Sequence, residues 1–208
     1  MINNIIFDMD GTLWDSSANV AESWNAAVDG LSDKRFTAED IQSVMGLPMD
    51  KIAERFFDTE TEETRLKIME RCCDGENEYL REHGGDIYPD TVPVFKDLSK
   101  SCRLFIVSNC QAGYIEAFLD YYGLREYITD HLCWGDNGLP KSENIRLIMQ
   151  RNGMESALYV GDTQTDCDSA YAAGARFAFA AYGFGTADRY DYKLNRLSEL
   201  VEILKNLR

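Results

Sequence analysis

The chain has 208 residues, of which 45% are hydrophobic, and it carries a formal net charge of −15. These values predict a folded globular protein of one large or two modest domains. The negative charge disfavours nucleic acid or an anionic membrane as the main partner. The sequence has no apolar run of roughly 20 residues and no basic N-terminal segment followed by an apolar core. We therefore expect a cytoplasmic protein without a membrane partner, either a monomer or a weak dimer.

The six cysteines are typical of reduced thiols rather than a disulfide framework. They form no Cys-x-x-Cys pair and lie in apolar surroundings, as small buried hydrophobes do. Neither His83 nor His131 lies at ligand spacing from them, which disfavours a zinc site.

Strand-like and helix-like segments alternate along most of the chain. Runs rich in β-branched and aromatic residues predict strands at 4–10, 103–109, 131–136, 157–162 and 176–183. Apolar residues at helical spacing predict helices at 114–124, 142–153, 165–175 and 197–207. This alternation predicts an α/β fold, with a doubly wound parallel sheet covered by helices on both faces.

Residues 15–87 break this alternation. They contain no convincing strand, but helical patterns lie at 17–31, 49–57 and 61–84, and the charged run 60–82 is typical of a solvated helix face. We therefore predict a core domain formed by residues 1–14 and 88–208 and an inserted helical domain formed by residues 15–87. Gly84-Gly85 and the region near Asp15 are candidate hinges.

Three predicted strands end in groups suited to binding ions. These are Asp8 with Asp10, Ser108 with Asn109, and Asp162 with Asp166 four residues further on. In an open parallel sheet the carboxyl ends of the strands face one crevice, so we expect these groups to be neighbours. Four carboxylates in one crevice repel one another, which predicts a hard divalent cation, Mg²⁺.

A cation from the protein is also expected at this crevice. Lys141 is the only lysine between Ser108 and Asp162, and it follows the loop Gly138-Leu139-Pro140. From that position we expect it to pair with Asp8 and with a phosphoryl oxygen.

In this order, the motifs resemble those of the haloacid dehalogenase-like (HAD) hydrolases. The matching residues are Asp8-Met-Asp10-Gly11-Thr12, Ser108-Asn109, Lys141 and Gly161-Asp162-x-x-x-Asp166. The resemblance covers almost the whole chain, and the helical insertion looks like the cap that follows the first strand in this family. The family often has proline after the lysine, whereas here Pro140 precedes it.

The resemblance implies a role for each residue of the first motif. Asp8 would be the nucleophile that forms an aspartyl-phosphate, and Asp10 the acid that protonates the leaving group and later activates water. Gly11 would allow the backbone to turn after the strand, and Thr12 would make a local hydrogen bond.

The resemblance also implies a metal site and a phosphate site. Mg²⁺ would be held by the Asp8 carboxylate, the Asp10 main-chain carbonyl and the Asp162 carboxylate. Asp166 would orient a water on the metal without binding the metal itself. The phosphoryl oxygens would be bound by Ser108, Asn109 and Lys141.

The function implied is hydrolysis of a small phosphate monoester. The cap and its stretch Gly46-Leu47-Pro48 look most like phosphoglycolate phosphatases, and residues 43–51, including Lys51, are candidate substrate contacts. A phosphomutase similar to the β-phosphoglucomutases stays open, because it shares the core motifs and the cap. A true dehalogenase is disfavoured by Asp10 and Asp162, and a phospho-aspartate receiver module by the long insertion.

Overall fold

The computed structural model describes residues 2–206, and within them six strands form one parallel sheet. In sheet order these are β5 (Ile128–Cys133), β4 (Arg103–Ser108), β1 (Asn4–Phe7), β6 (Leu158–Gly161), β7 (Arg176–Ala180) and β8 (Tyr192–Leu194). β1 lies inside the sheet and is buried along its whole length, so both of its faces carry apolar side chains.

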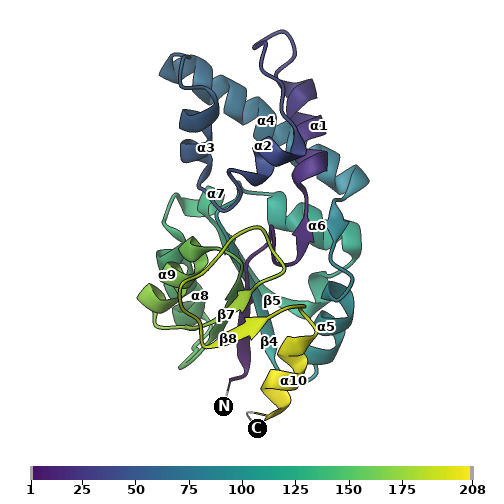
Figure 1. Cartoon of the computed structure of the whole chain (residues 1–208), viewed down its shortest axis with the longest axis vertical. Helices are drawn as coiled ribbons and strands as arrows, with labels where there is room; N and C mark the ends of the chain where they lie inside the picture. The colour runs from purple at the N-terminus through teal and green to yellow at the C-terminus, as the bar shows by residue number, and fades with distance from the viewer. Residues whose placement is uncertain (1, 207–208) are drawn as a thin grey trace.

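Helices cover both faces of the sheet (Figure 1). Ile5 and Phe7 of β1 pack into one core cluster, whereas Ile6 points to the opposite face and packs into a second. The first cluster includes residues of α5 (Thr91–Leu98), α6 (Tyr114–Tyr122) and α10 (Glu199–Asn206). The second includes residues of α8 (Lys141–Arg151) and α9 (Gln164–Ala173). The doubly wound α/β core predicted from the sequence is therefore confirmed.

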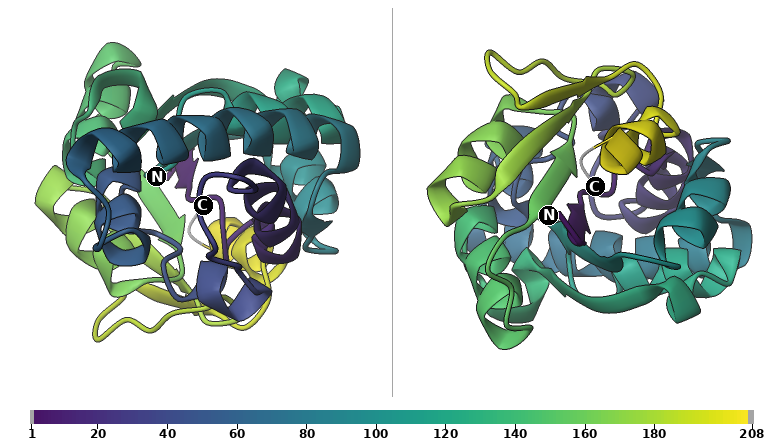
Figure 2. Two further views of the ribbon diagram at one scale, coloured as in Figure 1. Left: turned by 90° about the horizontal axis from the view of Figure 1, so that it is seen from above. Right: turned by 90° about the horizontal axis from the view of Figure 1, so that it is seen from below.

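Four helices form an insertion between β1 and the rest of the core. They are α1 (Ser17–Ala27), α2 (Ala38–Gln42), α3 (Met49–Phe56) and α4 (Glu62–His83), and we call them together the helical insertion. The insertion lies over the carboxyl ends of the parallel strands (Figure 1), and α4 crosses above them when the molecule is seen from above (Figure 2).

A short antiparallel ribbon joins the insertion to the core. It pairs β2 (Trp14–Asp15) with β3 (Asp86–Ile87) at the two points where the chain leaves and re-enters the core. Trp14 is fully buried against the rings of Tyr114 and Phe118, at centroid distances of 5.5 and 5.0 Å. The sequence of residues 15–87 predicts no strand, because two-residue strands are too short to show an alternating pattern.

Other elements also differ from the sequence-based expectation. β5 begins and ends three residues before the predicted strand at 131–136, and the residues after it form the short helix α7 (Trp134–Asn137). β8 is absent from the prediction, because three residues are too few to show an alternating pattern. The five-residue helix α2 is also absent from it, since it is too short for a clear helical period.

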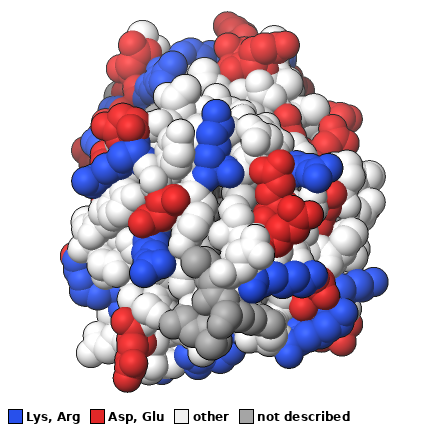
Figure 3. All heavy atoms as spheres, turned by 60° about the horizontal axis from the view of Figure 1, so that its bottom comes forward, with Lys and Arg blue, Asp and Glu red and all other residues white. Residues whose placement is uncertain are grey.

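The face away from the insertion mixes charges of both signs (Figure 3). On α5, Asp97 lies 3.2 Å from the Lys100 ammonium and 3.6 Å from that of Lys205. The six cysteines form no disulfide in the described part of the chain. Across residues 2–206, no helix combines the length and apolar character that a bilayer crossing requires.

Candidate active site

The candidate site lies where the strand order reverses. From β1 the chain first runs outward to β4 and β5, and then returns to the other side of β1 to form β6. Such a switch point leaves a crevice at the carboxyl ends of the strands, which is where open α/β sheets bind ligands. Asp8 follows β1, Asn109 follows β4 and Asp162 follows β6, so the fold brings these three residues together.

Lys141, the first residue of α8, places a buried ammonium between two aspartates. Its Nζ donates to Oδ1 of Asp8 at 2.9 Å and to Oδ1 of Asp166 at 2.6 Å. Lys141 is 2% exposed, so both ion pairs are shielded from water. The contact with Asp8 agrees with the pairing expected from the sequence, whereas the contact with Asp166 is not evident there.

Asp166 is held through both of its carboxylate oxygens. Oδ1 accepts from Lys141, and Oδ2 accepts from the Thr163 hydroxyl at 2.7 Å and from the Thr163 and Asp162 backbone N–H groups at 3.0 and 3.2 Å. With Thr163, Asp166 forms the capping box that begins α9. This network fixes the position of the lysine and of the turn that carries Asp162.

Asp162 is oriented by the loop that follows β7. Its Oδ2 accepts from the backbone N–H groups of Phe184 and Gly185 at 2.8 and 3.2 Å. Its Oδ1 accepts from the hydroxyl of Thr12 at 3.4 Å. The expected local bond of Thr12 is made by its backbone N–H, which donates to the Met9 carbonyl at 3.1 Å, whereas its hydroxyl reaches a residue 150 positions away.

Two glycines allow the backbone to approach this carboxylate closely. Gly11 has a φ of +78°, and a Cβ there would lie 2.4 Å from Oδ2 of Asp162. A Cβ on Gly183 would lie 2.3 Å from the carbonyl oxygen of Gly11. The predicted turn at Gly11 is present, and larger side chains at either position would displace Asp162.

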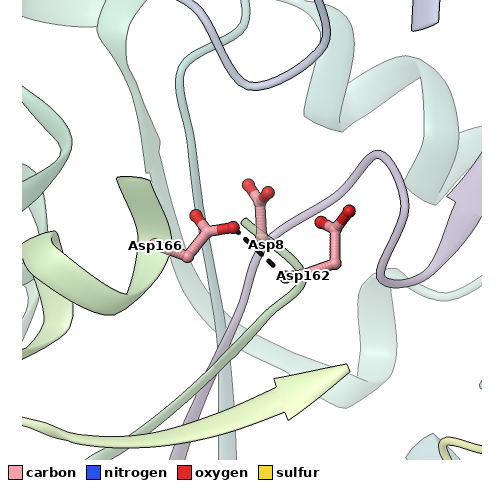
Figure 4. Close-up of side chains that lie close together, drawn as sticks. All are labelled: Asp8, Asp162 and Asp166. Carbon is pink, nitrogen blue, oxygen red and sulfur yellow. Dashed lines mark hydrogen bonds between the residues drawn. The ribbon is translucent and has the colours of Figure 1, made fainter. Parts of the chain in front are cut away.

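Asp8, Asp162 and Asp166 form a compact acidic cluster (Figure 4), with one carboxylate oxygen of each within 4.8 Å of the others. Burial, followed by the charge of Asp166, raises the pKa of Asp8 to about 8 and that of Asp162 to about 7. Burial by itself would lower the pKa of the Lys141 ammonium. The charges of Asp166 and Asp8 have the larger effect, so the pKa is raised.

The cluster is suited to a divalent cation. Its ion pairs involve one positive charge, that of Lys141, against the three carboxylates of Asp8, Asp162 and Asp166. Its donors are all oxygen atoms, which Mg²⁺ prefers. Asp166 is held by the Lys141 ammonium on one oxygen and by the cap of α9 on the other, whereas Asp162 is held only by neutral donors and Lys141 uses only one oxygen of Asp8. Asp8 and Asp162 are therefore the carboxylates better placed to bind a metal directly.

The Asp10 side chain is turned away from this cluster. Its Oδ1 accepts from the hydroxyls of Ser16 and Tyr114, both at 2.7 Å. Burial raises the pKa of this carboxyl to about 6. β1 ends at Phe7, so Asp8 and Asp10 do not share the face of a regular strand.

Ser108 and Asn109 end β4 at the same crevice, and both are buried. Nδ2 of Asn109 donates to the carbonyl of Gly46 in the helical insertion at 2.8 Å. Oδ1 of Asn109 is buried without a hydrogen-bond partner. The Asn109 side chain therefore connects the core to the insertion.

A cavity of about 50 Å³ lies between the core and the insertion. The core contributes Asp8, Asp10, Ser108 and Asn109, and the insertion contributes residues 44–47 among others. The candidate segment 43–51 thus supplies part of the lining. Lys51 is not among the lining residues, because it lies exposed on α3 and pairs with Glu54 at 2.9 Å.

Glu76 of α4 also lines the cavity, although it falls within the run 60–82 that the sequence suggests is a solvated face. It is 4% exposed, and its two oxygens accept from Nε1 of Trp24 at 2.5 Å and from Nε2 of Gln111 at 3.0 Å. A signal existed in the sequence: Glu76 continues the four-residue spacing of the buried Cys72 and Leu80.

Burial raises the pKa of Glu76 to about 7, against 4.5 for the free side chain. Between pH 4.5 and 7 the Glu76 carboxyl therefore stays protonated in the native state but ionises in the unfolded state. The free energy of unfolding of the wild type falls as the pH rises through this range. Relative to wild type, we expect Glu76→Gln to gain about 3 kcal/mol of unfolding free energy between pH 4.5 and pH 8. Urea unfolding of metal-free protein at several pH values measures this difference.

Glu78→Gln is the matched control, because Glu78 is exposed on the same helix. The difference in unfolding free energy between Glu78→Gln and the wild type should change little with pH. A flat profile for Glu76→Gln as well would contradict the raised pKa of Glu76.

Comparison with known proteins agrees with this fold. The family model described as "Haloacid dehalogenase-like hydrolase" matches residues 5–180. The phosphoglycolate phosphatase of Photobacterium profundum is 25% identical, with 98% of this chain and 96% of that protein aligned. That of Aquifex aeolicus is also 25% identical, over 97% of this chain and 96% of its own length.

A solved structure shows the same architecture over the whole chain. It is described as "a predicted phosphoglycolate phosphatase" from Haemophilus somnus and superposes with a TM-score of 0.85, at 20% identity and 98% coverage of both chains. Because the family match spans most of the sequence, the chain belongs to the haloacid dehalogenase-like hydrolases.

Proposed function

We propose that this hydrolase is a Mg²⁺-dependent phosphatase that cleaves a small phosphate monoester through an aspartyl-phosphate on Asp8. The observation that carries the proposal is the buried acidic cluster at the switch point, with Lys141 bound to Oδ1 of Asp8. This ion pair orients the carboxylate while its second oxygen is not used by Lys141. The full-length similarity to phosphoglycolate phosphatases supports the same reaction class.

The residues around Asp8 suit phosphoryl transfer. Ser108, Asn109 and Lys141 would bind the phosphoryl oxygens, where charge accumulates during transfer. Mg²⁺, when held by the Asp8 and Asp162 carboxylates and the Asp10 carbonyl, would keep these carboxylates ionised and offset the phosphoryl charge. Asp166 would not touch the substrate. It would hold Lys141 and the turn at Asp162 in position.

Asp10 is the proposed acid for the leaving alcohol. The hydroxyls of Ser16 and Tyr114 both bind its Oδ1, which leaves Oδ2 free to meet the leaving oxygen. The same carboxyl would then take a proton from the water that hydrolyses the aspartyl-phosphate.

We further propose that residues 15–87 move as a cap on a core of residues 1–14 and 88–208. The β2–β3 ribbon is the natural hinge, because it carries both connections between the two parts. The hydrogen bond from Asn109 to Gly46 would hold the cap closed and would break when substrate enters. Closure over the strand ends would exclude water during transfer to Asp8.

The proposal is tested with p-nitrophenyl phosphate as the reference substrate. We expect phosphate release with Mg²⁺, a loss of at least about 100-fold in EDTA and recovery when Mg²⁺ is added back. Release that is unchanged in EDTA would contradict the metal requirement. Isomerisation of a sugar phosphate in place of phosphate release would favour the phosphomutase alternative.

A further inference from the structure

We propose that the cavity selects phosphate monoesters whose leaving alcohol carries a protonated amine, and that Glu76 is the residue that determines this preference. The inference rests on the proposed phosphatase function and specifies its substrate class. It departs from the carboxylated substrate named for the similar enzymes.

The cavity lining formed by Glu76, Gln111 and Asn109 is rich in hydrogen-bond acceptors. Glu76 contributes a carboxylate, and Trp24 and Gln111 occupy one acceptor position on each of its oxygens. A carboxylate has about four such positions, so further donors can still bind. Gln111 and Asn109 line the same cavity, and Oε1 of Gln111 and Oδ1 of Asn109 are buried without a hydrogen-bond partner.

Unpartnered buried acceptors are costly, and a ligand that supplies donors removes the cost. Gln111 is 7% exposed and Asn109 is 4% exposed, so bulk water does not compensate for the missing bonds. An ammonium group offers three donors and no acceptor. It therefore matches a wall made of one carboxylate and two free amide oxygens.

In the part of the chain that the structure describes, the lining carries no positive charge that could pair with an anionic leaving group. Among the described residues that line the cavity, none is Lys, Arg or His. Lys141 is not a lining residue either, and it pairs with Asp8 and Asp166 at the phosphoryl end of the site. A substrate carboxylate would be buried near Glu76 and Asp10 without a counter-charge, which is strongly unfavourable.

The remaining lining limits the size of the leaving group. Val20, Val44 and Leu47 of the insertion give the cavity apolar sides. Its volume of about 50 Å³ leaves room for a short chain between the phosphoryl group and the ammonium. Burial also raises the pKa of Glu76 to about 7, and pairing with an ammonium would offset the cost of its charge.

Four esters of equal chain length test the inference with the Mg²⁺-loaded enzyme. They are O-phosphoethanolamine, 2-hydroxyethyl phosphate, ethyl phosphate and 2-phosphoglycolate, in which the second carbon carries an ammonium, carries a hydroxyl, is a methyl group or is a carboxylate. We expect kcat/KM to fall in that order, with O-phosphoethanolamine favoured over 2-phosphoglycolate by about 100-fold or more. Equal or faster hydrolysis of 2-phosphoglycolate by the wild type would overturn the inference.

Variants test whether Glu76 determines the preference for the ammonium ester. We expect Glu76→Gln to reduce the ratio between the ammonium and carboxylate esters to within about 5-fold. Glu78→Gln removes the same charge from an exposed position of α4 and should keep the wild-type ratio. An unchanged ratio in Glu76→Gln would refute the role of Glu76.

The controls separate this inference from the proposed function. If p-nitrophenyl phosphate and all four esters release phosphate without the expected order, the phosphatase activity stands and the inference fails. If none releases phosphate with Mg²⁺, both are wrong.

Discussion

Replacing Asp8 by asparagine is expected to lower Mg²⁺-dependent hydrolysis of p-nitrophenyl phosphate by about 10⁴-fold or more. An amide is too poor a nucleophile to form the acyl phosphate, and neither Asp162 nor Asp166 can take over. Both oxygens of Asp166 are engaged, and backbone N–H groups hold Oδ2 of Asp162. Initial rates at saturating Mg²⁺ measure the loss.

The Asp8→Asn variant should fold, which makes the activity loss interpretable. Asparagine keeps the shape of the side chain, and Lys141 keeps its ion pair with Asp166 at 2.6 Å. Asp168→Asn is the matched control, because Asp168 is exposed on α9, two residues beyond Asp166, and should retain activity within about twofold. Near-normal turnover in Asp8→Asn would exclude Asp8 as the nucleophile.

Replacing Lys141 by methionine is expected to lower the free energy of unfolding by about 3–5 kcal/mol in the absence of metal. The change keeps much of the buried chain but removes the ammonium that separates Asp8 from Asp166. Two buried carboxylates would then face each other without a counter-charge. Activity should also fall sharply, since a phosphoryl ligand is lost with the same group.

Mg²⁺ should stabilise Lys141→Met more than it stabilises the wild type, because the ion supplies positive charge to the same cluster. Urea unfolding with and without Mg²⁺ measures both quantities. Lys51→Met is the control: its side chain is 55% exposed and pairs with Glu54 at the surface, so a change of about 0–1 kcal/mol is expected. Equal losses in the two variants would disprove a special role for the buried ion pairs.

The sequence by itself determined the α/β core and the residues that gather at its edge. The reason is local, because apolar runs such as 103–108 indicate buried strands. The Asp, Ser and Asn residues at the ends of these runs lie at the carboxyl ends of the strands, where an open parallel sheet has its crevice. Because the order of strands and helices restricts the topology, it also predicted that Asp8, Asp162 and Lys141 would meet.

Only the tertiary structure decided what each group contacts. Thr12 bonds Asp162, Lys141 joins Asp166 to Asp8, and Asn109 reaches Gly46, although no local pattern links these positions. Glu76 is the clearest case, because a charged helix shows in its sequence which residues share a face but not what that face packs against. Periodicity and turn chemistry are properties of neighbours in sequence, whereas burial, pKa and hydrogen-bond partners depend on which segments the fold places side by side.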